Sequence, residues 1–491
     1  MGNTRVRVLK KEVLDMNITQ DVLEQKIAAA QAAGRKKMVD DIYRQGYHLM
    51  PPSGWMNDPN GLCWYKGNYH VFYQHSPLDA NRGNIFWGHF TSPDLLNWTQ
   101  QPTFLYPVDS WNLDGVYSGS ALVDEDAMYL YYTGNVKLPG DYDYIYEGRE
   151  HNLCMAVTKN GIMPDSNQLL MTNMDYPADV SCHVRDPKVW KMDGKYYMVL
   201  GARTKNDVGE LLIYESEDKY HWTHINVIKT PEPLGYMWEC PDIFCVDGQW
   251  IVMTSPQGMK SYRYVGQNVY SCGYFPLYGD FRGEYSLGEY CEMDAGFDYY
   301  APQTFEAPDG RRIVIGWMGM PDADYFNPTT EQLWQHCMSV PRELRWVNNR
   351  LTVQPVRELK ELRKEEEKFL CKGKISLPMY RLGEIFFCNQ NENLTIKIGE
   401  DAQIQWEDGL VHLSLSEQAG CGRTERILEM KELKNIRLLC DASSLELFVN
   451  DGEQVMTSRY YPGNVDVLTI YGNGEGARYK LRPMKIEWAE I

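Results

Sequence analysis

The sequence predicts an all-β protein, a β-propeller followed by a β-sandwich, with a short helical extension at the N-terminus. Three observations lead to this prediction. Over roughly residues 50–340, short runs rich in Tyr, Val, Ile, Phe and Trp alternate with turns of Gly, Pro, Asn and Asp. A sequence unit repeats within that region, and alternating strand patterns resume after it. The expected parts are a helical extension at 1–47, a propeller at 48–345, a linker at 346–368 and a sandwich at 369–491.

The N-terminal extension has the composition of a helix from 17 to 45. Residues 17–20 offer a capping sequence, and the alanine-rich stretch 26–33 is a strong helix former. An apolar stripe crosses an expected break at Gly34; its members are Ile27, Ala30, Met38, Ile42 and Tyr43. Two interpretations stay open: an arm that packs against the body of the protein, and an arm through which two copies form a homodimer.

The repeated unit consists of an acidic residue, a proline, an apolar strand, a tight glycine turn and an aromatic strand. Three copies occupy 58–69, 186–197 and 239–250, and weaker copies begin near Asp114 and Ala301. A shorter pattern, S-x-D-x-x-x-W, recurs at 92–98 and 216–222. Repeated β-sheets of this kind favour a propeller, in which equivalent strands converge on a central channel. We therefore expect Asp58, Asp186 and Glu239 to face one another.

The C-terminal part changes in character. The charged segment 351–367 is compatible with a helix and suits a linker. Alternating apolar and polar runs follow, for example at 411–415 and 445–449, and an N-D-G turn stands at 450–452. A turn of this kind after an alternating run indicates a hairpin, so we expect a separate antiparallel β-sandwich.

The three acidic residues have the chemistry that glycosidic bond cleavage requires. One carboxyl group must attack the anomeric carbon, and another must protonate the leaving oxygen. Asp58 follows Asn57, whose amide can keep a nearby carboxylate ionised, as a nucleophile needs. Asp186 follows Arg185, whose charge suits a carboxylate that binds sugar hydroxyls. Glu239 has apolar neighbours and no adjacent cation, which suits a proton donor.

Composition narrows the choice of partners. The net charge of −18 argues against nucleic acid and anionic membranes as partners, and no apolar run has transmembrane length. The start of the chain lacks the pattern of an export signal, and the 12 cysteines include no C-x-x-C pair. We expect reduced thiols, a cytoplasmic location and a small-molecule substrate. No metal cluster or nucleotide-binding loop is visible, and the chemistry requires no cofactor.

Three motifs together resemble a known family. W-M-N-D-P-N-G at 55–61, R-D-P at 185–187 and E-C-P at 239–241 resemble, in order and approximate spacing, the signature motifs of glycoside hydrolase family 32, the β-fructofuranosidases. The resemblance extends over about 48–488. Other segments that share in it are F-W-G-H at 86–89, Y-S-G-S at 117–120, Y-A-P-Q-T-F at 300–305 and D-A-S-S-L-E-L-F-V-N at 441–450.

The resemblance implies a five-bladed propeller, a C-terminal sandwich and a retaining double displacement. Asp58 matches the nucleophile, Glu239 the acid/base, and Asp186 the residue that stabilises the transition state. Family contacts to the fructose ring carry over to Asn57, Gln74, Tyr117, Ser118, Arg185 and Trp317. Trp87 matches an aromatic residue near the rim of the pocket. For Trp317, a place in the core of a blade is an equally valid interpretation.

One position departs from the family pattern. Relatives that act on uncharged sugars often carry a Trp eight residues after the equivalent of Gln74, where this chain has Arg82. Drift of a loop would explain the change. The sharper hypothesis is that Arg82, together with His75, binds a phosphate on the leaving glucose.

The expected activity is release of fructose from sucrose or sucrose 6-phosphate, and four alternatives stay open. The first is a fructan hydrolase, acting on inulin, levan or fructo-oligosaccharides. The second is an enzyme of a neighbouring five-bladed family that acts on arabinose-containing polymers, although such enzymes lack W-M-N-D-P-N-G. The third is a sugar-binding relative without catalysis, and the fourth is fructosyl transfer in place of hydrolysis.

Overall fold

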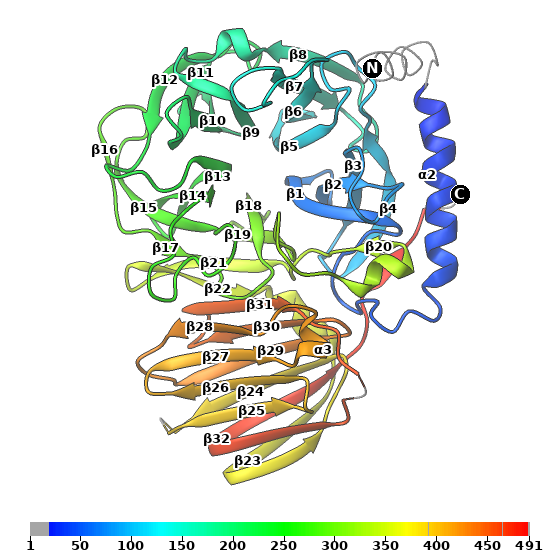
Figure 1. The fold of residues 1–491 in the computed structure, drawn as a ribbon, viewed down its shortest axis with the longest axis vertical. Helices are drawn as coiled ribbons and strands as arrows, with labels where there is room; N and C mark the ends of the chain where they lie inside the picture. Colours follow the sequence, from blue (N-terminus) through cyan, green and yellow to red (C-terminus); the bar gives the residue numbers. More distant parts are fainter. Residues whose placement is uncertain (1–18, 391, 464, 490–491) are drawn as a thin grey trace.

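The computed structural model of the chain describes residues 19–390, 392–463 and 465–489. Figure 1 shows a ring of β-sheets, a second β-rich body beside it, and one long helix along the outer side of the ring. Within the described part of the chain, no helix is long and apolar enough to cross a membrane. The prediction of an all-β protein is confirmed.

In the described residues, the ring consists of five sheets that follow one another along the chain. The first contains β1 (Gly54–Tyr65), β2 (Asn68–Ser76), β3 (Phe86–Ser92) and β4 (Asn97–Leu105), with β20 (Trp334–Gln335) and β33 (Lys485–Glu487) at its edges. The second contains β5 (Val116–Asp124), β6 (Ala127–Lys137), β7 (Arg149–Thr158) and β8 (Ser166–Met171). The third contains β9 (Val180–Met192), β10 (Lys195–Thr204), β11 (Gly209–Ser216) and β12 (Thr223–Ile228).

The remaining sheets of the ring are built in the same way. The fourth contains β13 (Met237–Val246), β14 (Gln249–Gln257), β15 (Gly273–Gly279), β16 (Tyr285–Leu287) and β17 (Cys291–Glu292). The fifth contains β18 (Tyr300–Glu306), β19 (Arg312–Trp317), β21 (Arg342–Val347) and β22 (Arg350–Pro355). Two short 3-10 helices lie in the connections, η1 (Asn173–Asp175) and η2 (Pro328–Gln332).

The first strand of each sheet lies on the inner side of the ring (Figure 1). β1 contacts β5, β5 contacts β9, β9 contacts β13, β13 contacts β18, and β18 contacts β1. Neighbouring sheets pack through buried apolar side chains; Phe72 and Trp87 of the first sheet, for example, share a core with Met128 and Leu130 of the second. Burial of such a side chain contributes about 1.5–3 kcal/mol, so the packing fixes the inner strands relative to one another. The architecture is a β-propeller.

The shorter repeat of the sequence has one structural role in two sheets. The Ser92 hydroxyl hydrogen-bonds Asp94 at 3.2 Å, and Asp94 Oδ1 accepts the backbone N–H groups of Leu96 and Asn97. Asp218 forms the same turn with Ser216, at the same 3.2 Å. Both turns lie between the third and fourth strands of their sheets, so the repeated sequence marks an equivalent position in two sheets.

The C-terminal body is sandwich-like, but its strands form one continuous sheet. Its strands are β23 (Arg363–Pro378), β24 (Gly383–Asn389), β25 (Leu394–Ile398), β26 (Ala402–Glu407), β27 (Leu410–Leu415), β28 (Glu425–Glu429), β29 (Asn435–Asp441), β30 (Ser444–Val449), β31 (Gln454–Arg459) and β32 (Val467–Leu481), with the short helix α3 (Glu417–Gly420). β32 pairs with β25 along one half and with β24 along the other. Gly373 of β23 faces Gly472 of β32 between these halves, and both have positive φ. These glycines allow the long ribbon to bend from one face of the sandwich to the other.

The range predicted as a linker is largely ordered into regular elements. It holds β22, which completes the fifth sheet, then the 3-10 helix η3 (Arg357–Leu362), and the start of β23. Leu359 and Leu362 are buried in the core that the propeller shares with the C-terminal body. The helical tendency of the charged segment is therefore realised in η3, while its flanks form strands.

The N-terminal extension contains the helix α2 (Gln20–Lys37), which continues through Gly34. The expected break is wrong, because Gly34 packs against the propeller: an added Cβ would lie 2.4 Å from the Pro52 carbonyl oxygen. Ile27 shares a small core with Phe86 and Tyr106 of the first sheet, whereas Ile42 is 56% exposed. Thr19 takes the capping position without a side-chain hydrogen bond, and residues 17 and 18 lie outside the described residues.

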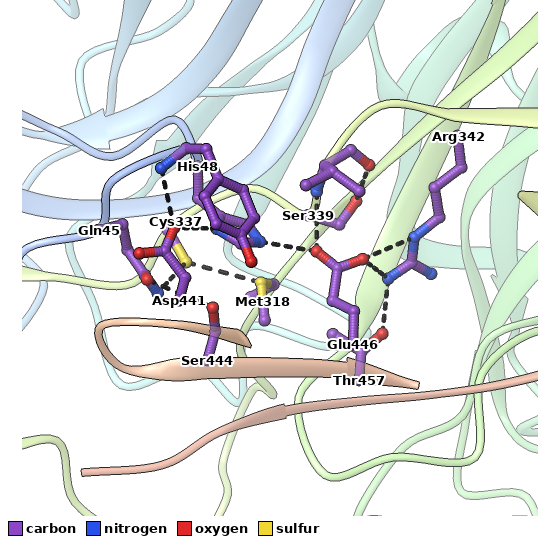
Figure 2. Close-up of polar contacts among 12 residues, drawn as sticks. Gln45, His48, Met318, Cys337, Ser339, Arg342, Asp441, Ser444, Glu446 and Thr457 are labelled. Carbon is purple, nitrogen blue, oxygen red and sulfur yellow. Dashed lines mark hydrogen bonds and ion pairs between the residues drawn. The ribbon is translucent and has the colours of Figure 1, made fainter. Parts of the chain in front are cut away.

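A buried ionic network joins the two bodies (Figure 2). His48, which precedes β1, hydrogen-bonds Asp441 of β29 through Nδ1 and Glu446 of β30 through Nε2, each at 2.7 Å. Glu446 also accepts hydrogen bonds from Arg342 of β21, whose Nη1 lies 3.1 Å from Asp294. Burial by itself would lower the pKa of His48, but the two carboxylates raise it to about 9. The imidazolium ion therefore bridges the propeller and the sandwich at neutral pH.

The raised pKa of His48 predicts a dependence of stability on alkaline pH. A histidine has a pKa of about 6.5 when unfolded, so the stabilisation is complete below that pH and is lost as the pH rises through about 9. The shift corresponds to about 3 kcal/mol. The Tm of the wild type should fall as the pH rises from 6.5 to 9.5. The Tm of His48→Gln should be lower than that of the wild type at pH 6.5 and should change less with pH above that value. The same slope in both proteins would contradict this role for His48.

Candidate active site

A cavity of about 650 Å³ opens where the inner strands meet. Asp58 of β1, Asp186 of β9 and Glu239 of β13 all line it, as the sequence repeat predicts. The other predicted site residues that line it are Asn57, Gln74, Arg82, Tyr117, Ser118, Arg185 and Trp317. The structure therefore brings together ten of the twelve predicted site residues around one cavity.

A β-bulge aims two consecutive side chains of an inner strand into the cavity. Pairing with the neighbouring strand shifts between Met56 and Pro59 on β1, and equivalent shifts occur on the other four inner strands. In a regular strand, consecutive side chains point to opposite faces, but a bulge re-aims one of them. Asp186 and Cys240 have φ of 64° and 46°, a strained conformation that the following proline and the bulge hold in place. The strain thus serves to place Arg185 together with Asp186 at the cavity.

Asp58 is held by three side-chain donors. Ser118 Oγ donates to Oδ2 at 2.5 Å, Asn57 Nδ2 donates to Oδ1 at 3.1 Å, and Cys240 Sγ lies 3.6 Å from Oδ2. Gln74 supports this arrangement, because it accepts from Asn57 at 2.6 Å and donates to Ser118 at 2.5 Å. Burial and the nearby Glu239 raise the pKa of Asp58, while the hydrogen bonds from Ser118 and Asn57 lower it. The network fixes the position of this carboxylate.

Asp186 is fixed through its backbone and one carboxylate oxygen. Its N–H donates to Thr133 Oγ1 at 2.9 Å, and its Oδ2 accepts the Cys240 N–H at 2.9 Å. Arg185 Nε lies 4.0 Å from the same oxygen. Burial raises the pKa of Asp186 above its usual range, Arg185 opposes this rise, and the negative charge of Glu239 adds to it.

Glu239 is the carboxylate that Arg185 contacts most closely. Arg185 donates to Glu239 Oε1 from Nε at 3.1 Å and from Nη2 at 2.6 Å. Tyr300 and Gln257 donate to Oε2 at 2.6 and 2.9 Å. The expectation that Glu239 lacks a nearby cation is wrong, because a residue from the adjacent inner strand supplies one. Neighbours in the sequence did not reveal which carboxylate Arg185 serves.

The repeat register also differs from the prediction. Asp58 and Asp186 stand one residue before their prolines, whereas Glu239 stands two residues before Pro241. Glu239 is thus equivalent to Asn57 and Arg185, and Cys240 takes the position of the two aspartates. The bulge brings both positions to the cavity, so the acidic residues still converge.

Two predicted contacts lie away from the cavity, which corrects the assignment made from sequence. Trp87 is fully buried between the first two sheets, and its Nε1 donates to the Tyr117 carbonyl oxygen at 3.1 Å. His75 is also buried, donates through Nε2 to the Ser53 carbonyl oxygen at 2.8 Å, and has its pKa lowered to about 4 by burial. His75 follows Gln74 on β2 and so points to the opposite face of the sheet, and a neutral His75 whose Nε2 is already hydrogen-bonded is no phosphate ligand. Trp87 lies directly opposite Gln74 on β3, but its ring packs into the core between the first two sheets. Trp317, by contrast, lines the cavity although it is only 2% exposed.

Several cavity residues were missed by reasoning from the sequence. Tyr300 precedes Ala301-Pro302, the motif of the weak fifth repeat, and its equivalence to Glu239 could have indicated it. Gln257, Lys137 and Arg149 lie on second or third strands of their sheets and belong to no repeated motif. Over residues 19–390, 392–463 and 465–489, no group of three or more His, Cys, Asp or Glu side chains is arranged to hold a metal ion.

The raised pKa values of Asp58 and Asp186 predict where activity is lost in acid. An ordinary aspartate protonates near pH ~3.9, so the acidic limb of the kcat/KM profile should lie above that value. Arg185→Gln removes the charge that lowers the pKa of Asp186, so the limb should move to higher pH and the maximum should fall. Arg282→Gln, which removes a cation paired with Asp280 away from the cavity lining, should leave the profile unchanged. An unmoved limb in Arg185→Gln would exclude this electrostatic coupling.

Comparison with known proteins gives a consistent result. Residues 48–355 match the model of the glycosyl hydrolases family 32 N-terminal domain, and residues 385–483 match that of the family 32 C-terminal domain. A sucrose-6-phosphate hydrolase of Bacillus subtilis (strain 168) is 37% identical over 87% of this chain and 91% of that protein. A raffinose invertase of Escherichia coli is 35% identical over 90% of this chain and 94% of that protein.

Solved structures of similar fold include enzymes of the same family. A family 32 β-fructofuranosidase of Bombyx mori has a TM-score of 0.83 and 30% identity, over 95% of this chain and 100% of that one. A sucrose-6-phosphate hydrolase of Lactobacillus gasseri has a TM-score of 0.85 and 27% identity, over 94% of this chain and 96% of that one.

Proposed function

Since the chain belongs to glycoside hydrolase family 32 and is a glycosidase of the β-fructofuranosidase type, we propose that Asp58 and Glu239 cleave the β-fructofuranosyl bond of sucrose or sucrose 6-phosphate with retention of configuration. The observation that carries the proposal is the shared cavity, in which Asp58 is held by Ser118 and Asn57 and Glu239 is held by Arg185 and Tyr300.

The first displacement transfers the fructosyl group to the protein. An Asp58 oxygen attacks the anomeric C2 of fructose while Glu239 gives its proton to the glycosidic oxygen. The bond from C2 to that oxygen breaks, and glucose or glucose 6-phosphate leaves. Burial and repulsion from Glu239 and Asp58 raise the pKa of Asp186, which favours retention of a proton among these three carboxylates.

The second displacement releases fructose. Glu239, now a carboxylate, takes a proton from a water molecule, whose oxygen attacks C2. The bond between C2 and Asp58 breaks, and both catalytic residues return to their starting states. Asp186 accepts hydrogen bonds from fructose hydroxyls and faces the positive charge that develops on the ring. Asn57, Gln74, Tyr117, Ser118, Arg185 and Trp317 complete the fructose site.

Hydrolysis of three substrates tests this proposal. Fructose release from sucrose, sucrose 6-phosphate and inulin should be measured at matched concentrations. Activity on one of the first two, with little on inulin, is the expected result. A preference for inulin would favour a fructan hydrolase. Binding of fructosides without fructose release from any substrate would contradict the proposal and favour a sugar-binding protein.

The propeller that carries this site is assigned five blades. We assign one blade to each of the five sheets, supported by the closed circuit of contacts among the inner strands. Free cysteines throughout the described residues are consistent with a cytoplasmic location. Association into a homodimer and the domain boundaries near 47, 345 and 368 stay predictions.

Arg82, which is exposed and lines the cavity, stays a candidate phosphate contact.

A further inference from the structure

The walls of the cavity carry opposite charges. Asp58, Asp186 and Glu239 lie together where the inner strands meet, whereas Lys137 and Arg149 line the wall formed by the second sheet. This basic wall was not predicted from the sequence, because neither cation belongs to a repeated motif. Its charge serves no step of the double displacement described above.

The two cations occupy directly opposed positions on neighbouring strands. Lys137, the last residue of β6, pairs in register with Arg149, the first residue of β7. Like charges opposite one another on paired strands destabilise a sheet. The strand register therefore brings two cationic residues together at the wall of the substrate cavity.

The surroundings of Arg149 leave its charge only partly compensated. Within the described residues, its Nε is buried without a hydrogen-bond partner. Burial lowers the pKa of Arg149, and the nearby Arg185 lowers it further, whereas Asp114 acts in the opposite direction. The Oδ2 of Asp114 accepts the backbone N–H of Lys137 at 2.7 Å. Lys137 itself lies over the ring of Tyr144, 5.6 Å from its centroid.

A buried histidine lies near the two cations in the sequence and senses their charge. His151, two residues after Arg149, is fully buried, and both of its ring nitrogens are without hydrogen-bond partners in the described part of the chain. Burial lowers the pKa of His151, and the charges of Arg185, Arg149 and Lys137 lower it further. His151 therefore stays neutral and adds no positive charge to this wall.

We propose that Lys137 and Arg149 form an anion subsite that binds the phosphate of a phosphorylated leaving group. This inference rests on the proposed function, because it assumes that the fructosyl ring occupies the carboxylate side of the cavity. A phosphate on that ring would face three carboxylates, whereas a phosphate on the departing glucose can reach the basic wall. Guanidinium and ammonium groups together suit a phosphate dianion, the former by paired hydrogen bonds and the latter as a point charge.

The first test compares two substrates with variants at the subsite. Lys137→Gln/Arg149→Gln should lower kcat/KM for sucrose 6-phosphate by about 10- to 100-fold and change that for sucrose by less than about 3-fold. Arg149→Lys, which keeps the charge, should recover part of the loss. Lys36→Gln, an exposed cation on α2, is the matched control and should change neither substrate. Equal losses on both substrates, or no loss on either, would overturn the subsite.

A second measurement separates failure of the subsite from failure of the proposed function. Calorimetric binding of glucose 6-phosphate needs no turnover, and the wild type should bind it more tightly than glucose. The double variant should bind the two sugars equally. A wild type that binds glucose 6-phosphate but hydrolyses nothing would contradict the proposed function alone, whereas equal wild-type affinity for both sugars would overturn the subsite alone.

Discussion

Asp58→Asn is expected to lower kcat for the preferred fructoside by roughly 10⁴-fold or more, a loss of about 5 kcal/mol in transition-state stabilisation. An amide cannot form the bond to C2 on which the double displacement depends. The folded protein should survive the change, because Asn retains the shape that Ser118 and Asn57 surround. Initial-rate kinetics on sucrose and sucrose 6-phosphate, with Tm measured alongside, would give both results.

The same variant carries a stability prediction of defined sign. Burial raises the pKa of Asp58 in the folded protein, so the ionised side chain costs stability once the pH exceeds the unfolded value of about 3.9. A neutral Asn removes that cost, and Tm at pH 7 should be equal to or higher than that of the wild type. Asp126→Asn, at an exposed turn between β5 and β6, should match the wild type in activity. Substantial activity in Asp58→Asn would exclude it as the nucleophile.

Glu239→Gln is expected to lower kcat by about 10²- to 10⁴-fold for substrates whose leaving group needs a proton. The loss should be much smaller for the first step of a fructoside with an acidic leaving group, because such a group departs without protonation. For that substrate the second step becomes limiting, since no base activates water. Stopped-flow kinetics should then show a burst of leaving group followed by slow turnover.

Chemical rescue sharpens the role of Glu239. Azide is a nucleophile that needs no general base, so it should restore turnover of the activated fructoside in Glu239→Gln and give fructosyl azide. In Asp58→Asn no intermediate forms, so any azide that reacts displaces the leaving group directly and gives fructosyl azide of inverted configuration, whereas Glu239→Gln gives the retained configuration. Fructosyl azide of the retained configuration from both variants would refute the division of roles between the two carboxylates.

The propeller was predictable because its physical basis is a local pattern that recurs. All five inner strands carry a bulge, and β1, β9, β13 and β18 also share the proline, the apolar strand and the glycine turn. The contacts among β1, β5, β9, β13 and β18 follow from their equivalent positions. The continuous sheet of the C-terminal body was less accessible. Its bend depends on Gly373 and Gly472, which lie far apart in the chain and pair only in the folded protein. The helix α2 continues through Gly34 for a similar reason, since tertiary packing against Pro52 outweighs the weak helical propensity of glycine.

The convergence of the acidic residues was also predictable, but their electrostatic partners were not. Arg185 is adjacent in sequence to Asp186, yet its guanidinium reaches across to Glu239. The length of the arginine side chain and the β-bulge decide which carboxylate it pairs with. Neither can be inferred from the residues adjacent in the sequence. The same limitation applies to Trp87. Its match to a family position predicted a place near the rim of the pocket, but the side chain is fully buried in the core. Lys137 and Arg149 escaped notice because strand register alone brings them together.

If Asp58 is the nucleophile, it forms a covalent fructosyl intermediate that can be trapped. Glu239→Gln should be mixed with an activated fructoside, quenched in acid during the slow phase, digested and analysed by mass spectrometry. The peptide containing Asp58 is expected to gain the mass of one fructosyl group, and Asp58→Asn/Glu239→Gln is expected to show no adduct. A stoichiometric burst of leaving group without an adduct, or an adduct on the peptide containing Asp186, would contradict it.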